Sequence, residues 1–248
     1  MTTRLLPFAL LAMTAAPALA FDAAEMTETE RAAFRAEVRA YLLENPEVIM
    51  EAVAILEQRQ QAEAAGAERA LVAANAAAIF EDGVSWVGGN PEGDVTVVEF
   101  MDYSCGYCKR AAPEVTELVR ADGNIRLVIK EFPILGEESL LASRFAIAVR
   151  RVAGDAAYEG VHHALMGLRA NVTPDALAAL ATAQGLDAAA IMAGMDAPEV
   201  QAEIDANHAL GTTLGINGTP TFVIGDQMVR GYVPLAGMQE IVAAERAD

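Results

Sequence analysis

The sequence predicts an α/β domain with a helical insertion, preceded by a helical N-terminal arm. Three observations predict this fold class. Residues 27–82 show the periodicity of helices. An apolar run over Val95–Met101 then leads into the pair Cys105 and Cys108, which opens a helix-compatible segment. Two further strand-like runs follow only after a long helical stretch over about 139–213.

The N-terminus has the pattern of a secretory signal peptide, which we expect to cover residues 1–20. Arg4 supplies the positive start, and Ala18-Leu19-Ala20 is a small-x-small cleavage site. The apolar run between them is shorter than the roughly 17 residues that a membrane-spanning helix needs. An uncleaved N-terminal anchor is the alternative. Export would bring the cysteine pair into an oxidising compartment, so we expect the periplasm of a Gram-negative host.

The charge balance excludes one class of partner. Lys and Arg total 17 against 35 for Asp and Glu, which gives a net charge of −18. Nucleic-acid binding depends on basic side chains that neutralise phosphates, so we expect no nucleic-acid partner. A chain of this length can bury a core without a disulfide scaffold.

Residues 21–82 are expected to form a helical oligomerisation and linker region. Thr27 and Glu30 have the spacing of a capping box. Asn45-Pro46 is expected to end one helix and to start the next, with Asn45 as the N-cap. Apolar residues recur at helical spacing on both helices, at Phe34, Val38, Tyr41, Leu42, Val48, Ile49, Ala52, Val53 and Leu56. These stripes must be buried against something, so they predict self-association; a helix folded back onto its own domain is the alternative.

The main domain is expected over residues 83–248. It starts with a short strand over Val84–Val87 and continues, after a Gly-rich turn, with the buried strand Val95–Met101. Glu99 interrupts this strand, and alternation turns its side chain inward, where burial raises the pKa of a carboxyl group. We expect Glu99 to lie beneath the second cysteine as a proton acceptor. The alternative is an edge-strand carboxylate in water.

Cys105 and Cys108 are the only cysteines, and they are separated by Gly106 and Tyr107. This spacing at a helix start brings both sulfurs to one end of the helix. The first sulfur then faces free backbone N–H groups and the positive end of the helix dipole, which stabilise thiolate over thiol. The second sulfur is close enough to attack a mixed disulfide. The pattern therefore predicts redox chemistry.

An inert bridge and a metal site are the alternatives for this pair. A tetrahedral zinc site needs four ligands, and His162, His163 and His208 have no ligand spacing to the cysteines. A soft ion such as Cu(I) can bind two thiolates, so copper binding stays open. We expect no cofactor and no metal in the catalytic role.

The second strand of the domain is expected over Ile125–Phe132. Lys130 in this strand is expected either to be the charge partner of Glu99 or to be a solvated lysine at the strand end. No convincing strand follows over 139–213, which predicts helices, and we expect His162 and His163 there to lie on the surface or to satisfy hydrogen bonds.

The segment after the insertion delivers Thr219-Pro220 directly into the apolar strand Thr221–Ile224. Proline cannot donate to a sheet ladder, so it is expected at the first residue of the strand. A cis Thr219–Pro220 bond is expected here, with an ordinary trans proline as the alternative. A hairpin over Gly225–Tyr232 and a closing helix over Pro234–Ala244 complete the domain.

This order of elements resembles the DsbA family of thioredoxin-fold proteins over about residues 83–246. The motifs that carry the resemblance are Glu99-Phe100, Cys105-Gly106-Tyr107-Cys108 and Gly218-Thr219-Pro220-Thr221-Phe222. Residues 27–60, with Tyr41-Leu42-Leu43-Glu44-Asn45-Pro46-Glu47-Val48, resemble the N-terminal module of the ScsC and Com1-like branch.

The resemblance implies roles for these residues. Cys105 would be the exposed nucleophile and Cys108 the buried resolving thiol, while Gly106 and Tyr107 would tune the redox poise. Thr219 and cis-Pro220 would offer backbone to an extended substrate. Glu99 matches the buried acid of the family, and Lys130 is a weaker match. The arm would assemble the chain into a homo-oligomer, with a trimer favoured.

These inferences predict a periplasmic thiol–disulfide oxidoreductase that acts on exported proteins with cysteines. The Gly-Tyr dipeptide differs from the Pro-His of the oxidant DsbA and is similar to that of the isomerase DsbC, so an isomerase or reductase is expected. A membrane-bound redox partner would reduce or oxidise it. A DsbA-type dithiol oxidase and a Cu(I)-binding copper-tolerance protein are the alternatives.

Overall fold

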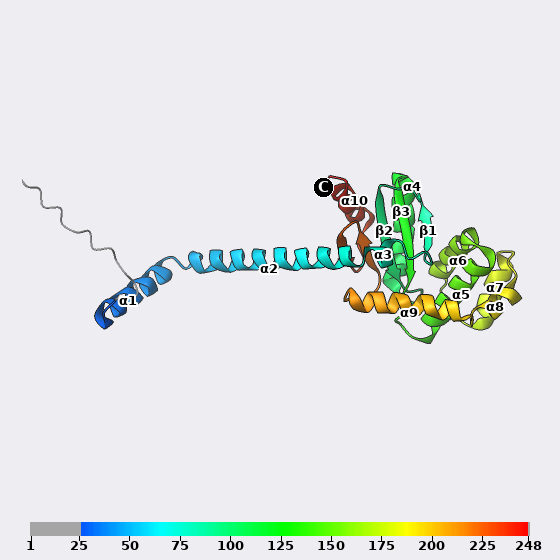
Figure 1. Ribbon diagram of the computed structural model, residues 1–248, viewed down its shortest axis with the longest axis horizontal. Helices are drawn as coiled ribbons and strands as arrows, with labels where there is room; N and C mark the ends of the chain where they lie inside the picture. Colours follow the sequence, from blue (N-terminus) through cyan, green and yellow to red (C-terminus); the bar gives the residue numbers. More distant parts are fainter. Residues whose placement is uncertain (1–25, 248) are drawn as a thin grey trace, which may run out of the picture. The chain divides into compact units, whose positions relative to one another are not determined.

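The computed structural model describes residues 26–247, so the predicted signal peptide lies outside the described residues. The chain divides into two compact units, one up to Gln61 and one from Ala62 onward (Figure 1). Within residues 26–247, none of the helices combines the length and the apolar character that crossing a membrane requires.

The first unit contains α1 (Glu28–Glu44) and the first part of α2 (Glu47–Ala74). The predicted capping box is confirmed, because the Thr27 hydroxyl accepts from the Glu30 N–H while the Glu30 carboxylate accepts from the Thr27 N–H. The expected role of Asn45 as an N-cap is wrong. Asn45 caps the end of α1 instead, because its side-chain amide donates to the Tyr41 carbonyl at 2.9 Å.

Large apolar side chains are exposed on this unit. No residue of α1 is buried. The exposed large hydrophobic residues of the unit are Phe34, Val38, Tyr41, Leu43, Ile49, Met50, Val53, Ile55 and Leu56. Leu43 and Met50 are the most exposed of them, at 64% and 67%. The predicted helices with apolar stripes are therefore present.

The second unit is organised around a five-stranded sheet with the order β1-β3-β2-β4-β5. Its strands are β1 (Trp86–Gly89), β2 (Val95–Met101), β3 (Ile125–Glu131), β4 (Thr221–Ile224) and β5 (Gln227–Arg230). Strands β2 and β3 are parallel, and the other pairs are antiparallel. β2 lies at the centre between β3 and β4, so the predicted buried strand is confirmed and the edge-strand alternative for Glu99 is wrong.

The helices of the second unit also follow the predicted order. They are the end of α2, α3 (Ala76–Phe80), α4 (Gly106–Asp122), α5 (Glu137–Ala153), α6 (Asp155–Gly167), α7 (Pro174–Ala183), α8 (Ala188–Gly194), α9 (Pro198–Thr213) and α10 (Leu235–Glu245). The predicted helical insertion between β3 and β4 is confirmed as α5–α9. Figure 1 shows α5, α6, α7 and α8 gathered together and α9 running back along the sheet.

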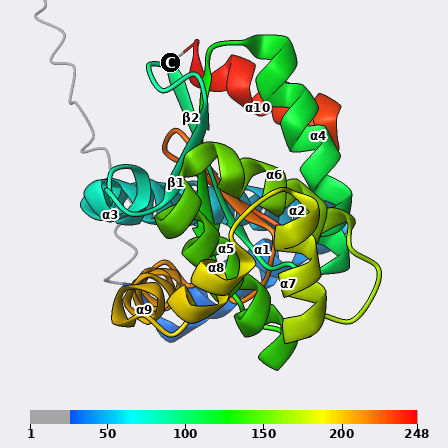
Figure 2. The ribbon, with the colours of Figure 1, turned by 90° about the vertical axis from the view of Figure 1, so that its right-hand side faces the viewer.

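Alternate residues of β2 divide the core into two layers, one on each face of the sheet. Val97 and Met101 face the layer that contains α4 and α6. Val98 and Phe100 face the layer that contains α3 and α9. Helices α4 and α10 lie side by side in both views (Figures 1 and 2). The insertion therefore contributes helices to both faces.

The expectations for Lys130 are both wrong. Lys130 is the register partner of Phe100, so it points to the α3 and α9 layer, whereas Glu99 is paired with Ile129 and faces α4 and α6. A sheet separates the two groups, so Lys130 is not the partner of Glu99. It is not solvated either, because its side chain is fully buried.

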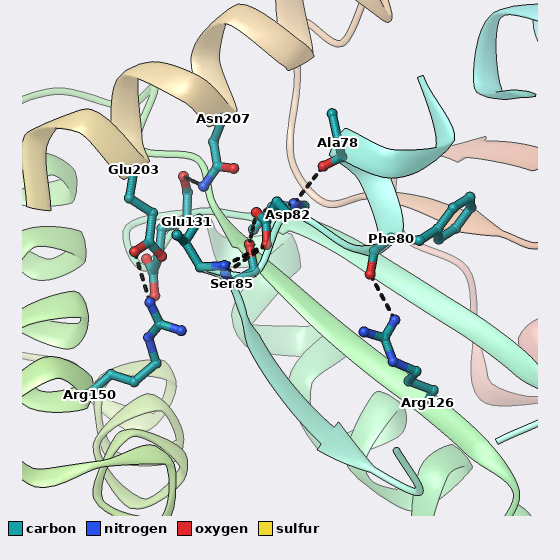
Figure 3. Close-up of polar contacts among 11 residues, drawn as sticks. Ala78, Phe80, Asp82, Ser85, Arg126, Glu131, Arg150, Glu203 and Asn207 are labelled. Carbon is teal, nitrogen blue, oxygen red and sulfur yellow. Dashed lines mark hydrogen bonds and ion pairs between the residues drawn. The ribbon is translucent and has the colours of Figure 1, made fainter. Parts of the chain in front are cut away.

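Lys130 instead fastens α3 to the sheet. Its Nζ donates to the Asp82 carboxylate at 2.5 Å and to the Ala78 carbonyl at 2.8 Å. The Arg126 guanidinium donates to the Phe80 carbonyl at 2.9 Å (Figure 3). These cations satisfy carbonyls at the C-terminal end of a short helix, where no intrahelical donor remains.

Candidate active site

Cys105 lies at the junction between the sheet and α4. It is the N-cap residue of α4, so its sulfur lies at the end of the helix that carries unpaired N–H groups. Its thiol donates to the Thr219 carbonyl oxygen at 3.2 Å. Only 8% of the residue is exposed, so Cys105 is buried in this structure.

Cys108 lies one turn further along α4 and is fully buried. Both cysteines are free thiols in this structure. Burial is the largest cause that raises the pKa of the Cys108 thiol well above its ordinary value, and the Glu99 carboxyl raises it further. The structure thus places two buried thiols at the start of α4: the burial of Cys108 is as expected, whereas the expected exposure of Cys105 is wrong.

Glu99 faces this buried thiol from β2. The residue is 2% exposed, and its Oε1 atom has no hydrogen-bond partner among residues 26–247. Burial raises the pKa of Glu99 to about 8. The predicted inward orientation is confirmed. A carboxyl group with this pKa exchanges its proton near neutral pH, which suits a group that gives protons to a thiolate or takes them from a thiol.

Asp102 holds together two loops at the ends of β2 and β3. One carboxylate oxygen accepts the Ser104 N–H at 2.7 Å. The other accepts the N–H groups of Ile134 and Leu135, at 2.8 and 3.0 Å. The carboxylate is fully buried, so it fixes the loop that leads into Cys105 against the loop after β3.

A second buried carboxyl group lies at the end of β3. Glu131 accepts the hydroxyls of Tyr103, Tyr158 and Ser143 at 2.9, 2.6 and 2.7 Å. The Tyr103 hydroxyl also lies 3.1 Å from Nδ1 of His162. Burial raises the pKa of Glu131 to about 8 and lowers that of His162 to about 3, so the imidazole is neutral.

Sequence reasoning missed this network, although a signal for Glu131 was present. Glu131 continues the inward-facing series Ile125, Leu127 and Ile129 on β3, as Glu99 does on β2. The same alternation argument applied to the second strand would have found it. The hydroxyl partners come from the segment before α4 (Tyr103), from α5 (Ser143) and from α6 (Tyr158), and periodicity alone does not bring these elements together.

The loop before β4 completes the site. The Thr219–Pro220 bond is cis, as predicted. The Thr219 carbonyl is the group that meets the Cys105 thiol, and the Pro220 carbonyl accepts the Gly231 N–H at 2.9 Å. Backbone atoms of this loop therefore lie beside the nucleophile, where an extended chain can pair with them.

Tyr107 forms an aromatic surface next to the cysteines. Its side chain is 61% exposed, and its ring stacks on that of Tyr232 with centroids 6.4 Å apart. The Arg110 guanidinium lies 4.4 Å from the Tyr232 ring centroid. The Glu114 carboxylate accepts the Tyr232 hydroxyl at 2.6 Å. One face of α4 thus orients a second tyrosine that the sequence did not single out.

No group of three or more His, Cys, Asp or Glu side chains within residues 26–247 is arranged to hold a metal ion. Cys105 and Cys108 are soft ligands at the start of α4, so a copper site would depend on them.

Two family models match the chain. Residues 96–243 match the DSBA-like thioredoxin domain, and residues 30–63 match the Copper resistance protein ScsC N-terminal domain. A curated relative, the Na(+)/H(+) antiporter NhaA 1 of Salinispora arenicola (strain CNS-205), is 33% identical over 96 residues. That match spans 38% of this chain and only 14% of the antiporter.

Several solved structures are similar to about 70% of this chain. A thioredoxin-like oxidoreductase from Silicibacter pomeroyi DSS-3 is 46% identical, with a TM-score of 0.66 over 69% of this chain and 98% of that chain. The catalytic domain of Proteus mirabilis ScsC is 26% identical, with a TM-score of 0.66 over 73% and 99%. A periplasmic thioredoxin-like protein from Salmonella enterica serovar Typhimurium is 29% identical, with a TM-score of 0.62 over 69% and 95%.

Proposed function

The chain belongs to the DSBA-like thioredoxin domain family of oxidoreductases, and we propose that within it the protein is a periplasmic disulfide isomerase or reductase. The observation that carries the proposal is the arrangement of the two thiols. Cys105 stands at the start of α4 beside the Thr219 carbonyl, and Cys108 is buried behind it. An attacking thiol with a protected second thiol is the minimum that disulfide exchange needs.

The exchange begins at Cys105. Its thiolate attacks one sulfur of a substrate disulfide, and a Cys105–substrate disulfide forms while the other substrate sulfur leaves as a thiolate. In isomerisation, a substrate thiolate then attacks the mixed disulfide, so Cys105 is released reduced and the substrate disulfide has moved. No net electrons are transferred in that cycle.

Reduction needs Cys108. The Cys108 thiol loses its proton to the ionised Glu99 carboxylate, and the resulting thiolate attacks Sγ of Cys105. The bond between Cys105 and the substrate breaks, the substrate sulfur leaves as a thiolate, and a Cys105–Cys108 disulfide forms. Two electrons pass to the substrate. A membrane-bound dithiol partner would then reduce the enzyme, with the protonated Glu99 returning its proton to Cys108.

Substrates are proposed to be exported proteins that bind in extended form. The backbone of Thr219 and Pro220 lies beside Cys105 and favours pairing with an extended segment around the substrate cysteine. Gly106, which has no side chain, and the exposed Tyr107 follow Cys105 in the first turn of α4 and leave its surroundings open to such a segment. The periplasmic location is supported by the signal-like N-terminus and by the similar periplasmic thioredoxin-like protein of Salmonella enterica.

The first unit is proposed to assemble copies of the chain, with a trimer favoured. Its exposed apolar side chains lie on helices, and the same residues match the ScsC N-terminal domain model. A second copy presents the same apolar stripe, so self-association buries both. An assembly of reduced sites supports isomerisation, because neighbouring copies shield each site from oxidising partners.

Scrambled ribonuclease tests the proposed activity. We expect the purified, reduced chain to restore ribonuclease activity, Cys105→Ser to abolish the recovery, and Cys108→Ser to retain part of it while trapping mixed disulfides. Absence of recovery together with fast oxidation of reduced ribonuclease would overturn the isomerase proposal in favour of a dithiol oxidase. Absence of both would remove the exchange function altogether.

A further inference from the structure

A cavity of about 740 Å³ lies between the sheet, α4 and α6. Its volume falls within the roughly 300–1,000 Å³ that is typical of sites for small molecules. The sheet and α4 supply an apolar wall, which includes Val115, Val119 and Ile129. The indole ring of Trp86, the only tryptophan of the chain, also lines the cavity. The cavity therefore suits a ligand with an apolar body.

Helix α6 supplies a polar wall. Asp155, Glu159 and His162 line the cavity and are spaced by four and three residues along α6, so their side chains are neighbours on one face of the helix. Asp155 and Glu159 are exposed, and neither carboxylate takes part in a hydrogen bond or an ion pair within residues 26–247. Two carboxylates are therefore available to a ligand where the cavity meets the surface.

His162 offers a third acceptor, at a buried position of the same wall, because the residue is only 7% exposed. Its Nδ1 lies 3.1 Å from the hydroxyl oxygen of Tyr103, which donates its own proton to Glu131. Burial lowers the pKa of His162 to about 3, so the neutral ring donates Nδ1–H to Tyr103 and keeps Nε2 as an acceptor. Nε2 makes no hydrogen bond within residues 26–247. A buried acceptor of this kind favours a ligand that brings a donor.

The side-chain donors around the cavity, in contrast, are mostly engaged within the protein. The Arg120 guanidinium is paired with a carboxylate of its own helix at 2.7 Å. The Asn90 amide, the Thr116 hydroxyl and the Trp86 indole N–H each donate to another group of the protein. The exposed ring of His163 also lines the cavity and can donate or accept. A ligand thus meets mainly acceptors, two of which carry negative charge.

We propose that this cavity binds a small organic cation, a primary ammonium ion carried on an aromatic or branched apolar body. The body lies against the apolar wall, and the ammonium N–H groups are donated to Glu159, Asp155 and Nε2 of His162. An ammonium group has three donors and no acceptor, which matches a wall that offers three acceptors. A carboxylate ligand would be repelled by the two acidic side chains. Neither cysteine lines the cavity, so binding requires no thiol chemistry.

Titration of the full chain with 2-phenylethylammonium tests the site, with the fluorescence of Trp86 as the readout. The anion 3-phenylpropanoate and the neutral 2-phenylethanol carry the same ring and serve as comparison probes. We expect the ammonium probe to saturate the signal with a dissociation constant of about 1 mM, reasonable for a ligand of this size. The anion should bind roughly tenfold more weakly or not at all. Equal binding of the ammonium ion and the anion, or no binding of the ammonium ion, would overturn the proposal.

Removal of the two carboxylates tests recognition of the charge. Asp155→Asn combined with Glu159→Gln should weaken binding of 2-phenylethylammonium roughly tenfold and leave binding of 2-phenylethanol unchanged. The matched control is Glu137→Gln combined with Asp175→Asn, which removes two exposed carboxylates that do not line the cavity. This control should bind both probes as the wild type does. If the two double variants bind the ammonium ion equally well, the carboxylates of α6 do not recognise it.

Filling the opening tests the location. Ala156 is an exposed residue of α6 that lines the cavity, and Ala189 is an exposed residue of α8 that does not. We expect Ala156→Phe to abolish binding of 2-phenylethylammonium and Ala189→Phe to leave it at the wild-type value. Binding that persists in Ala156→Phe would place the probe elsewhere and overturn the proposal.

Nitrogen NMR of the His162 ring tests the buried acceptor without a substitution in the core. The Nε2 signal should move when 2-phenylethylammonium is added and should stay in place with 3-phenylpropanoate. A signal that does not respond to the ammonium ion would exclude His162 from the site. None of these measurements involves disulfide exchange, so a negative result leaves the function proposed above intact.

Discussion

The Glu131 carboxylate accepts a hydrogen bond of 2.9 Å from the hydroxyl of Tyr103, two residues before Cys105. The bond joins the end of β3 to the segment that carries the nucleophile. The same carboxylate accepts Tyr158 from α6 at 2.6 Å. The helical insertion is therefore attached to the active-site segment through one buried group.

Tyr103→Phe is predicted to affect reactivity as well as stability. It removes the hydrogen bond that the Tyr103 hydroxyl donates to the Glu131 carboxylate, and we expect this loss to lower the free energy of unfolding by about 1–2 kcal/mol. Tyr158→Phe is the matched control, because it removes a hydroxyl from the same carboxylate away from the cysteines. Urea unfolding measures the cost, and iodoacetamide alkylation of Cys105 measures the reactivity. If both variants alkylate at the wild-type rate, Tyr103 has no role in positioning the site.

Glu99→Gln is predicted to stabilise the protein at high pH. The folded pKa of about 8 lies above the reference value of 4.5, so folding favours the protonated carboxyl group. That contribution is fully present below pH 4.5 and is lost as the pH rises through 8. The neutral amide escapes this loss, and we expect an advantage of roughly 2–4 kcal/mol at pH 9. Denaturant unfolding at pH 4.5 and pH 9 checks it; a difference independent of pH would contradict the burial of Glu99.

Lys130→Met is predicted to weaken the attachment of α3 without changing the thiol chemistry. It leaves the Asp82 carboxylate without its cation and the Ala78 carbonyl without its donor. We expect a loss of about 3 kcal/mol, near the lower limit for breaking a buried ion pair because Asp82 is partly exposed. The double variant Lys130→Met with Asp82→Asn should recover part of the loss. A large change in Cys108 reactivity would show that Lys130 communicates with the opposite face after all.

Removal of residues 21–61 is predicted to give a monomer. The cut is placed before Ala62 because Val72 and Ile79 are buried in the layer under the sheet, so a longer deletion would expose that core. We expect the shortened chain to keep reductase activity and to lose most isomerase activity. Mass determination in solution checks the assembly. An unchanged oligomeric mass would place the interface in the second unit.

Copper binding is predicted to depend on the thiol pair. Residues 30–63, which match the copper resistance domain model, contain no Cys or His and only Met50 as a soft ligand. Cu(I) titration of the reduced chain should therefore show no binding in Cys105→Ser beyond that of a cysteine-free control. Binding that persists in Cys105→Ser would rule out the thiolate pair as the site.

The parts of the site that sequence patterns predicted are local ones. The strand over Val95–Met101, the helix that starts at Gly106 and the cis bond before Pro220 each depend on residues close together in the chain. The inward orientation of Glu99 also follows from alternation along a single strand. Such features are determined by backbone preferences and by residues adjacent in the sequence, so they can be predicted from a short stretch of the chain.

The partners of the buried charges were decided by tertiary structure. Lys130 forms an ion pair with Asp82, which is 48 positions away in the sequence. Glu131 accepts a hydrogen bond from Tyr103, which is 28 positions away. The register of β2 against β3 determines which face each side chain takes, and a shift of one residue would exchange the faces. The cavity beside Glu99 likewise depends on how α4 and α6 pack on the sheet. By itself, then, the sequence determined the dithiol, the strand and helix that present it and the family it resembles. Only the tertiary structure decided which groups pair with the buried charges at Lys130 and Glu131. These partners depend on distances between separate helices and strands, which no local sequence pattern encodes.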